Sequence, residues 1–279
     1  SFMGKLMSIS RFCHRSAALG LIGLLFSPLA AASYLDHPKA KAFIDEVVAE
    51  GTFKKDELEA LLGSAERKDG ILEAIARPAE KTKTWAEYRP IFMTQDRLEG
   101  GVAFAKEHAV ALEKAEQEFG VSRYIILAII GVETRYGKFK GNYRVVDALA
   151  TLAFDYPPRA PFFRSELKHF LHLQSEAKID LSSAKGSYAG AMGYPQFISS
   201  SYRNFAVDFD GDQHIDLINS PVDAIGSVAS YFKAHGWDQQ QPVTSLARYL
   251  GEDGSESKLD PVVNQDLKPV LTVADLRAR

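Results

Sequence analysis

The stretch Ser122–Gly137, SRYIILAIIGVETRYG, decides how this chain folds. Ser122 is a residue type that begins helices well, because its hydroxyl accepts a hydrogen bond from a backbone N–H of the first turn. Gly137 is the type that commonly follows a helix at C′. Between them, Tyr124–Val132 is almost wholly apolar, and a helix that is apolar all round has no solvent face. The stretch therefore predicts a helix that runs through the centre of a domain.

A single carboxylate, Glu133, stands at the end of this apolar helix. Poor solvation and the negative end of the helix dipole both disfavour its charged form, so both raise its pKa. A carboxylic acid that stays protonated near neutral pH suits a general acid. The residues alone leave a second interpretation equally open, in which Glu133 is turned to water and paired with Arg135.

The composition indicates a soluble globular protein. The 279 residues are 46% hydrophobic and 25% charged. This length is enough for one large core or for two to three smaller lobes. The net charge of −3 gives no sign of a nucleic-acid partner, and the sequence has neither Cys/His metal-site spacing nor a glycine-rich phosphate loop.

The first 32 residues are typical of a cleavable signal peptide. A basic segment precedes the short apolar run Ala17–Phe26, and small residues follow at Ala30–Ala32. Cys13 lies before the apolar run, whereas the lipid-modified cysteine of a lipoprotein follows such a run. No lipobox is therefore found. We expect an exported, periplasmic protein whose mature chain has no stable membrane insertion. An uncleaved N-terminal anchor is the alternative.

Helical periodicity dominates from residue 33 to residue 236. We expect an N-terminal helical lobe over 33–120 and a core over 121–236, with a helical excursion at 140–184. His169 and His172, three residues apart, could bind a metal, but surface or packing histidines are the simpler interpretation. The expected helices are Lys39–Glu50, Lys55–Leu62, Ile71–Ala76, Thr84–Tyr88, Gln95–Phe119, Asp147–Ala153, Pro161–Gln174, Ser199–Phe205 and Pro221–Gly236.

A glycine-rich segment, Lys185–Phe209, mixes aromatic and amide side chains. Tyr188, Tyr194, Gln196 and Phe197 lie among three glycines. Aromatic rings beside hydrogen-bonding groups suit sugar rings, which have an apolar face and a polar rim. The alternative is a tight turn with packed aromatic residues.

The segment 208–223 predicts an EF-hand-like calcium loop. Carboxylates at its first, third and fifth positions repel one another unless a cation joins them, and hard oxygen ligands favour Ca²⁺. Gln213 and Asn219 depart from the pattern at its sixth and twelfth positions. An acidic turn held by Asx hydrogen bonds is the alternative. The candidate ligands of a structural Ca²⁺ are Asp208, Asp210, Asp212, the carbonyl of His214, and Asp223.

The character of the chain changes after Trp237. Short β-branched pieces such as Val270–Val273 are separated by a polar loop at Gly251–Lys258. We therefore expect a small, partly β subdomain over 237–279.

Four motifs together resemble the lytic murein transglycosylase B family of bacterial enzymes, glycoside hydrolase family 103. The resemblance implies a mainly α fold with a lysozyme-like (goose-type) core. It begins near Tyr34 and is densest from Gly131 to Trp237. The motifs are GVETRYG at Gly131–Gly137, DALATLAFDYPPRAPFF from Asp147, AGAMGYPQF at Ala189–Phe197, and VDFDGDQHIDL followed by PVDAIGSVASYFKAHGW.

The resemblance implies a reaction on peptidoglycan glycan strands. Such enzymes cleave the β-1,4 bond between N-acetylmuramic acid (MurNAc) and N-acetylglucosamine (GlcNAc) and leave a 1,6-anhydroMurNAc end. Glu133 matches their single acid/base. The calcium loop matches as well, but here it is one residue longer before Asp223 than in the family. The matching substrate-binding positions are Ser187, Gln196, Met192, Phe197, Tyr88, Tyr231 and Arg159.

Family members normally continue past the β subdomain and return to the core. Because this sequence stops at Arg279, we expect weakened saccharide binding and an exposed apolar patch. We expect a monomer without an organic cofactor. The alternatives to a lytic transglycosylase are a hydrolytic muramidase, a non-catalytic peptidoglycan-binding protein and a calcium-binding module.

Overall fold

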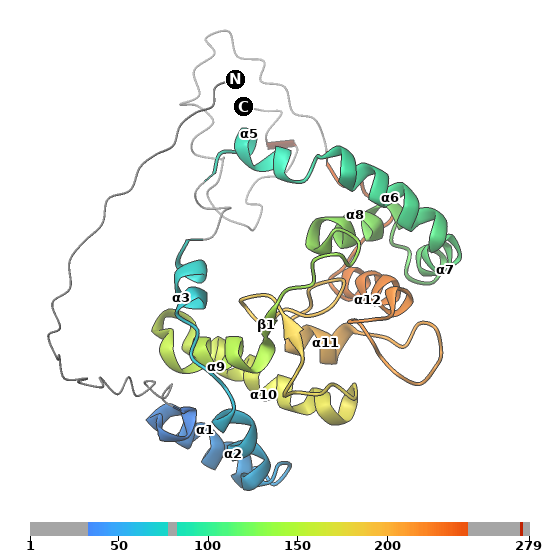
Figure 1. Cartoon of the computed structure of the whole chain (residues 1–279). Coiled ribbons are helices and arrows are strands. Elements are labelled where there is room, and N and C mark those ends of the chain that lie inside the picture. Colours follow the sequence, from blue (N-terminus) through green and yellow to red (C-terminus); the bar gives the residue numbers. More distant parts are fainter. Residues whose placement is uncertain (1–32, 78–82, 245–273, 276–279) are drawn as a thin grey trace, which may run out of the picture.

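The structure, a computed structural model, describes residues 33–77, 83–244 and 274–275. It is mainly helical, as predicted (Figure 1). The predicted signal peptide lies outside the described residues, and so does most of the predicted β subdomain. In the described ranges, no helix combines the length and the apolar character needed to cross a membrane.

Apart from Gln95–Phe119, the expected helices form with boundaries that shift by a few residues. A two-stranded antiparallel ribbon pairs Tyr143 with Gly186 and Arg144 with Lys185. The elements are α1 (Pro38–Ala49), α2 (Lys55–Gly63), α3 (Asp69–Ala76), α5 (Trp85–Tyr88), α6 (Gln95–Glu107), α7 (Ala109–Phe119), α8 (Arg123–Thr134), α9 (Val145–Asp155), α10 (Ala160–Glu176), α11 (Ser199–Phe205) and α12 (Pro221–Ala234), short 3₁₀ turns at Tyr34–Asp36, Arg89–Ile91 and Pro157–Arg159, and strands β1 (Tyr143–Arg144) and β2 (Lys185–Gly186).

Two hydrophobic clusters organise these elements. The first cluster joins α1, α2 and α3 to α9, α10 and the segment that contains Met192 and Phe197. The second cluster joins α6, α7, α8 and α12, with Phe209 between them. Residues 33–120 therefore contribute to both clusters, and in Figure 1 α6 and α7 lie beside α8 and α12, away from α1 and α2.

The helix at the centre of a cluster is α9, because every residue from Val145 to Phe154 is buried. The expectation that the apolar helix α8 would be enclosed on all sides was wrong. α8 buries Ile126 and Ile130, but Tyr124 is 74% exposed and Val132 is 43% exposed. Its neighbours α6, α7 and α12 cover only one side of it.

Two further expectations need correction. The single helix expected over Gln95–Phe119 is broken at His108, whose backbone is not helical and whose ring packs on Phe104 at 4.4 Å. The helix α8 ends at Thr134, and Arg135 is its left-handed C-cap, so Gly137 is not at C′. The N-cap expectation is confirmed, since the Ser122 hydroxyl accepts from the N–H of Tyr124 at 3.4 Å.

His169 and His172 behave as packing residues. His169 Nδ1 lies 2.8 Å from a guanidinium nitrogen of Arg203. The ring of His172 packs edge-on against Phe53 at 5.0 Å. Neither belongs to the one cluster of potential metal ligands found among the described residues.

Candidate active site

The last turn of α8 opens onto a pocket of about 320 Å³ that lies where the two hydrophobic clusters meet. Glu133 is the one carboxylic acid among the described residues that line it. The opposite walls come from the segment after Gly193 and from α12. The lining residues are Ile129, Glu133, Pro195, Gln196, Phe197, Ile198, Ser201, Val228, Tyr231 and Phe232.

Glu133 is solvent-accessible because the pocket is open, but the pocket walls displace much of the water around its carboxyl group. This desolvation raises the pKa of Glu133 above its ordinary value. Arg135 does not pair with it, because the Arg135 guanidinium faces Asp96 at 3.5 Å. Of the two interpretations left open by the sequence, the pairing with Arg135 is not seen, whereas the raised pKa of Glu133 agrees with the first interpretation.

Aromatic rings form the wall contributed by α12. The ring of Tyr231 packs against Phe197 at 5.5 Å and against Phe205 at 5.1 Å. On its other side it stacks on His235, with ring centroids 4.0 Å apart. These contacts fix the Tyr231 ring at the edge of the pocket, and a fixed aromatic ring can take the apolar face of a sugar.

Gln196 lines the same pocket in a strained backbone conformation, with φ +52°. Its side-chain amide donates to the carbonyl oxygens of Gly193 at 2.9 Å and Lys140 at 3.2 Å. Both bonds tie the side chain to the backbone, so Gln196 is held in place at the pocket.

Four other predicted substrate-binding residues are not among the pocket-lining residues. Met192 is fully buried, because its backbone pairs with Phe197 and its side chain enters the first cluster, so a groove-lining role is contradicted. The Ser187 hydroxyl accepts two backbone N–H groups of its own turn. Tyr88 packs on Phe92 at 5.0 Å, and the Arg159 guanidinium lies over the Phe162 ring at 4.3 Å.

Sequence reasoning missed several residues of the pocket. Ile129 precedes Glu133 by one turn of α8, and Phe232 follows Val228 by one turn of α12, so helical spacing relates the members of each pair. Ser201 and Val228 lie on α11 and α12, and the packing of α11 on α12 and of α12 on α8 brings them to the pocket.

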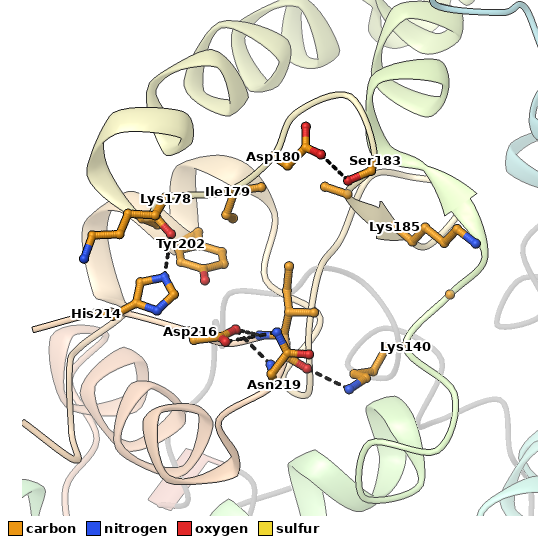
Figure 2. A pocket seen from close by; sticks show the side chains of 14 residues that line it. Lys140, Lys178, Ile179, Asp180, Ser183, Lys185, Tyr202, His214, Asp216 and Asn219 are labelled. Carbon is orange, nitrogen blue, oxygen red and sulfur yellow. Dashed lines mark hydrogen bonds between the residues drawn. The ribbon is translucent and has the colours of Figure 1, made fainter. Parts of the chain in front are cut away.

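A second pocket, of about 400 Å³, lies between the loop after α10 and the second half of the segment 208–223, called the acidic loop below (Figure 2). Its floor is apolar, with Ile179 and Tyr202, and lysines lie at its edge. Hydrogen bonds from the Ser183 and Ser182 side chains lower the pKa of Asp180 to about 2. This carboxylate stays ionised, so it does not suit a general acid.

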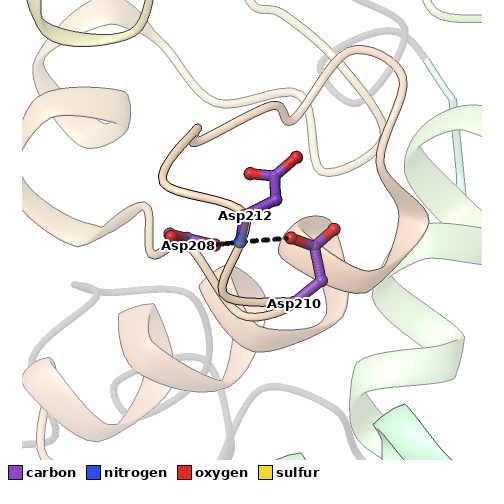
Figure 3. Close-up of side chains that lie close together, drawn as sticks. All are labelled: Asp208, Asp210 and Asp212. Atoms are coloured by element: carbon purple, nitrogen blue, oxygen red, sulfur yellow. Dashed lines mark hydrogen bonds between the residues drawn. The ribbon is translucent and has the colours of Figure 1, made fainter.

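The predicted calcium ligands Asp208, Asp210 and Asp212 come together in the acidic loop (Figure 3). Each offers a carboxylate oxygen, and these oxygens lie within 4.8 Å of one another. Asp208 also accepts the backbone N–H groups of Gly211 and Gln213, each at 2.7 Å. Three converging carboxylates provide the hard oxygen ligands that Ca²⁺ prefers.

Asp223 stands apart from this cluster. It is 1% exposed, and its two oxygens accept the N–H groups of Phe209 at 2.7 Å, Asp210 at 3.3 Å and Asp216 at 2.8 Å. The structure therefore shows Asp223 organising the loop from α12. The His214 ring points to the carbonyl oxygen of Ala177 at 2.9 Å.

A family model described as the transglycosylase SLT domain matches residues 36–276. Membrane-bound lytic murein transglycosylase B of Escherichia coli (strain K12) is 45% identical over 223 residues, 77% of this chain and 62% of that protein. The chain thus spans about 62% of the length of this curated relative.

Two solved structures have similar folds. The soluble lytic transglycosylase SltB1 from Pseudomonas aeruginosa matches with a TM-score of 0.80 and 49% identity over 86% of this chain and 80% of that chain. Escherichia coli Slt35 in complex with calcium matches with a TM-score of 0.71 and 45% identity over 76% of this chain and 67% of that chain. These matches confirm the predicted mainly α, lysozyme-like fold.

Proposed function

The chain belongs to the family of transglycosylase SLT domains, and on this premise we propose that it is a lytic transglycosylase of peptidoglycan. It cleaves the β-1,4 bond between MurNAc and GlcNAc and leaves a 1,6-anhydroMurNAc end. The observation that carries the proposal is Glu133, whose carboxyl has a raised pKa and lines a pocket with aromatic walls.

In the proposed reaction Glu133 acts twice. Its carboxylic acid first gives a proton to the glycosidic oxygen as the bond from that oxygen to C1 of MurNAc breaks. The substrate's own N-acetyl group stabilises the positive charge that develops at C1. The Glu133 carboxylate then takes the proton of the C6 hydroxyl as the C6 oxygen bonds to C1. No water is consumed, and the acid is regenerated.

The pocket supports one carboxyl in both roles. A hydrolytic glycosidase usually needs a second carboxylate, about 5–9.5 Å from the first. Glu133 has no such companion among the described residues that line this pocket. An internal hydroxyl nucleophile needs none, because the substrate itself holds the attacking oxygen close to C1.

The walls support a saccharide ligand. Tyr231, backed by the largely buried ring of Phe197, offers aromatic surface for the apolar side of a sugar, and the fixed amide of Gln196 offers a polar contact. We assign Tyr231, Phe197 and Gln196 to substrate binding. Ser187 shapes the adjoining turn in this proposal.

A structural Ca²⁺ is part of the proposal. Asp208, Asp210 and Asp212 would hold it with their carboxylates and His214 with its carbonyl, while Asp223 shapes the loop behind them. The relative Slt35 was solved with calcium, which agrees with this donor set. Bound there, the cation neutralises three like charges in one exposed turn.

The proposed substrate also suggests where the chain works. Peptidoglycan lies outside the cytoplasmic membrane, so we propose a periplasmic location, in agreement with the signal-peptide pattern of the sequence. Fractionation of cells that express the full chain, with periplasmic and cytoplasmic marker enzymes as controls, tests this location.

Mass spectrometry of purified murein sacculi tests the reaction. The chain, Glu133→Gln and the control Glu57→Gln, which changes an exposed glutamate of α2, are incubated separately with sacculi. We expect anhydro-muropeptides from the chain and the control, and a loss of about 100- to 10,000-fold in Glu133→Gln. Reducing-end products, heavier by one water, would instead identify a hydrolase. Binding to sacculi without any product would identify a binding protein.

A further inference from the structure

Thr134, the residue after Glu133, connects two walls of the pocket. Its side chain is 1% exposed. The Thr134 hydroxyl donates to the carbonyl oxygen of Tyr194 at 2.9 Å and lies 3.3 Å from that of Ile130. The hydroxyl oxygen of Thr134 also accepts a hydrogen bond from the N–H of Gly137 at 3.0 Å. One buried hydroxyl therefore joins the helix end, the turn after it and a segment sixty residues further along the chain.

The turn that this hydroxyl holds is strained. Arg135 and Tyr136 both have left-handed backbones, with φ +49° and +60°. This conformation costs a residue other than glycine about 1–2 kcal/mol. It persists only where its surroundings hold it. Here the holding bonds run from the Tyr136 N–H to the carbonyl oxygen of Ile130, at 3.2 Å, and from the Gly137 N–H to Thr134.

The other end of the link is equally well fixed. The N–H of Tyr194 donates to the carbonyl oxygen of Leu217 at 2.9 Å. A Cβ on Gly193 would lie 2.1 Å from that same oxygen, so only glycine permits the approach. Directly after Tyr194 come Pro195–Phe197, which line the pocket opposite Glu133.

We propose that Thr134 is a positioning residue for Glu133: its hydroxyl locks the last turn of α8 to the Tyr194 carbonyl, and this sets the carboxyl group against the wall at Pro195–Phe197. This inference rests on the proposed function for the chemistry that Glu133 performs. Thr134 itself is buried and does not line the pocket, so it acts only through its neighbour.

Charged groups near the helix end hold it from another side. From α6, Arg97 donates to the carbonyl oxygen of Gly131 at 2.5 Å, and Asp96 pairs with Arg135 at 3.5 Å. From α12, the phenol-bearing ring of Tyr231 lines the pocket.

The cause of the raised pKa of Glu133 is desolvation, so a looser helix end that admits water lowers this pKa toward its ordinary value.

Three variants separate positioning from simple stability. Thr134→Val keeps the shape and removes the hydroxyl, whereas Thr134→Ser keeps the hydroxyl. Thr151→Val is the matched control, because Thr151 is fully buried and its hydroxyl accepts the N–H of Lys68 at 3.1 Å in the first cluster, away from the pocket. For each variant, kcat and KM on soluble uncross-linked glycan strands, the pH profile of kcat and the melting temperature are measured.

We expect Thr134→Val to lower kcat by about 10- to 100-fold with KM changed by less than about two-fold. The alkaline limb of the pH profile of kcat should move to lower pH in Thr134→Val. Thr134→Ser keeps the hydroxyl and should restore most of kcat. Thr151→Val should lower only the melting temperature. The same loss of melting temperature in both valine variants, with kcat and pH profile unchanged, would overturn the proposal.

A direct titration keeps this test independent of the proposed function. The carboxyl carbon of Glu133 is followed by NMR against pH, with Glu133→Gln used to assign its signal. We expect a lower pKa in Thr134→Val than in the unchanged chain, and an equal pKa would overturn the positioning role. A chain that releases no product from glycan strands overturns the proposed function, and the titration alone then decides the role of Thr134.

Discussion

The phenol of Tyr136 fills the space that a Cβ on Gly131 would need, with its oxygen 2.5 Å from that position. The same ring lies against Gly100 and Gly101 of α6, whose Cβ positions would be 3.2 Å and 3.1 Å from the nearest ring carbon. Three glycines on two helices thus form a slot for one aromatic ring. The ring ties α6 to the turn that follows Glu133.

Filling this slot should destabilise the chain. In Gly131→Ala the new methyl group would overlap the Tyr136 ring, and overpacking of this kind costs about 1–3 kcal/mol. Urea unfolding measures the loss. The control is Gly70→Ala on α3, where the nearest atom to the new Cβ is 3.9 Å away. Equal free energies of unfolding for the two variants would contradict the slot.

The raised pKa of Glu133 predicts how stability depends on pH. Between the ordinary value of 4.5 and the raised value, the folded chain keeps a proton that the unfolded chain releases. Stability therefore falls as pH rises through this window, and the loss persists above it. Glu133→Gln has no carboxyl group to ionise, so it does not lose this stability. Its melting temperature should be higher than that of the unchanged chain at about pH 7 and equal to it at about pH 4. A melting-temperature difference that does not change with pH would refute this assignment, and Glu57→Gln serves as the control.

The Tyr231 ring should matter more than its hydroxyl. Tyr231→Phe keeps the contacts with Phe197, Phe205 and His235, so it should change stability little. Tyr231→Ala removes the ring and should raise KM for soluble glycan strands by about 10-fold or more, as expected for the loss of about 1.4 kcal/mol of binding. It should also cost about 1–3 kcal/mol of stability, less than a fully buried aromatic ring would. An unchanged KM in Tyr231→Ala would remove this wall from the substrate site.

Calcium should stabilise the chain through the acidic loop. At about 100 times its Kd, a ligand that binds only the folded state adds about 2.7 kcal/mol. Calorimetric melting with calcium and with a chelator should show this difference in the chain and in Asp45→Asn, which changes an exposed carboxylate of α1. The difference should vanish in Asp210→Asn. A calcium effect that survives this substitution would place the cation elsewhere.

The sequence predicted elements and motifs better than their packing. Local signals identified the helices, since caps and periodicity are properties of neighbouring residues: Ser122 caps α8 as expected, and Pro161 lies in the first turn of α10. The two-residue strands escaped notice, because pairing of Tyr143 with Gly186 is a long-range contact that no local pattern encodes.

Which helix is covered on all sides was harder to predict, because this also depends on long-range contacts. The sequences of α8 and α9 are similarly apolar, yet α9 is covered on all sides whereas Tyr124 of α8 is exposed. The place of Glu133 at the end of an apolar run predicted poor solvation, and desolvation does raise its pKa. Met192 was misplaced, because an apolar residue in a glycine-rich segment can face either a groove or the core. In the structure its backbone pairs with Gly186 and Phe197, which are both close to the first cluster.

The meeting of two separate hydrophobic clusters at the pocket has a mechanical consequence. Glu133 is carried by α8 of the second cluster, while Phe197 belongs to the first. The distance from the Glu133 carboxyl group to the Phe197 ring therefore depends on how the two clusters are joined, and not only on the packing inside either one. If the proposed function holds, the fit of the pocket to a glycan strand is set by the contacts between the clusters, such as the contact of the Tyr231 ring with Phe197.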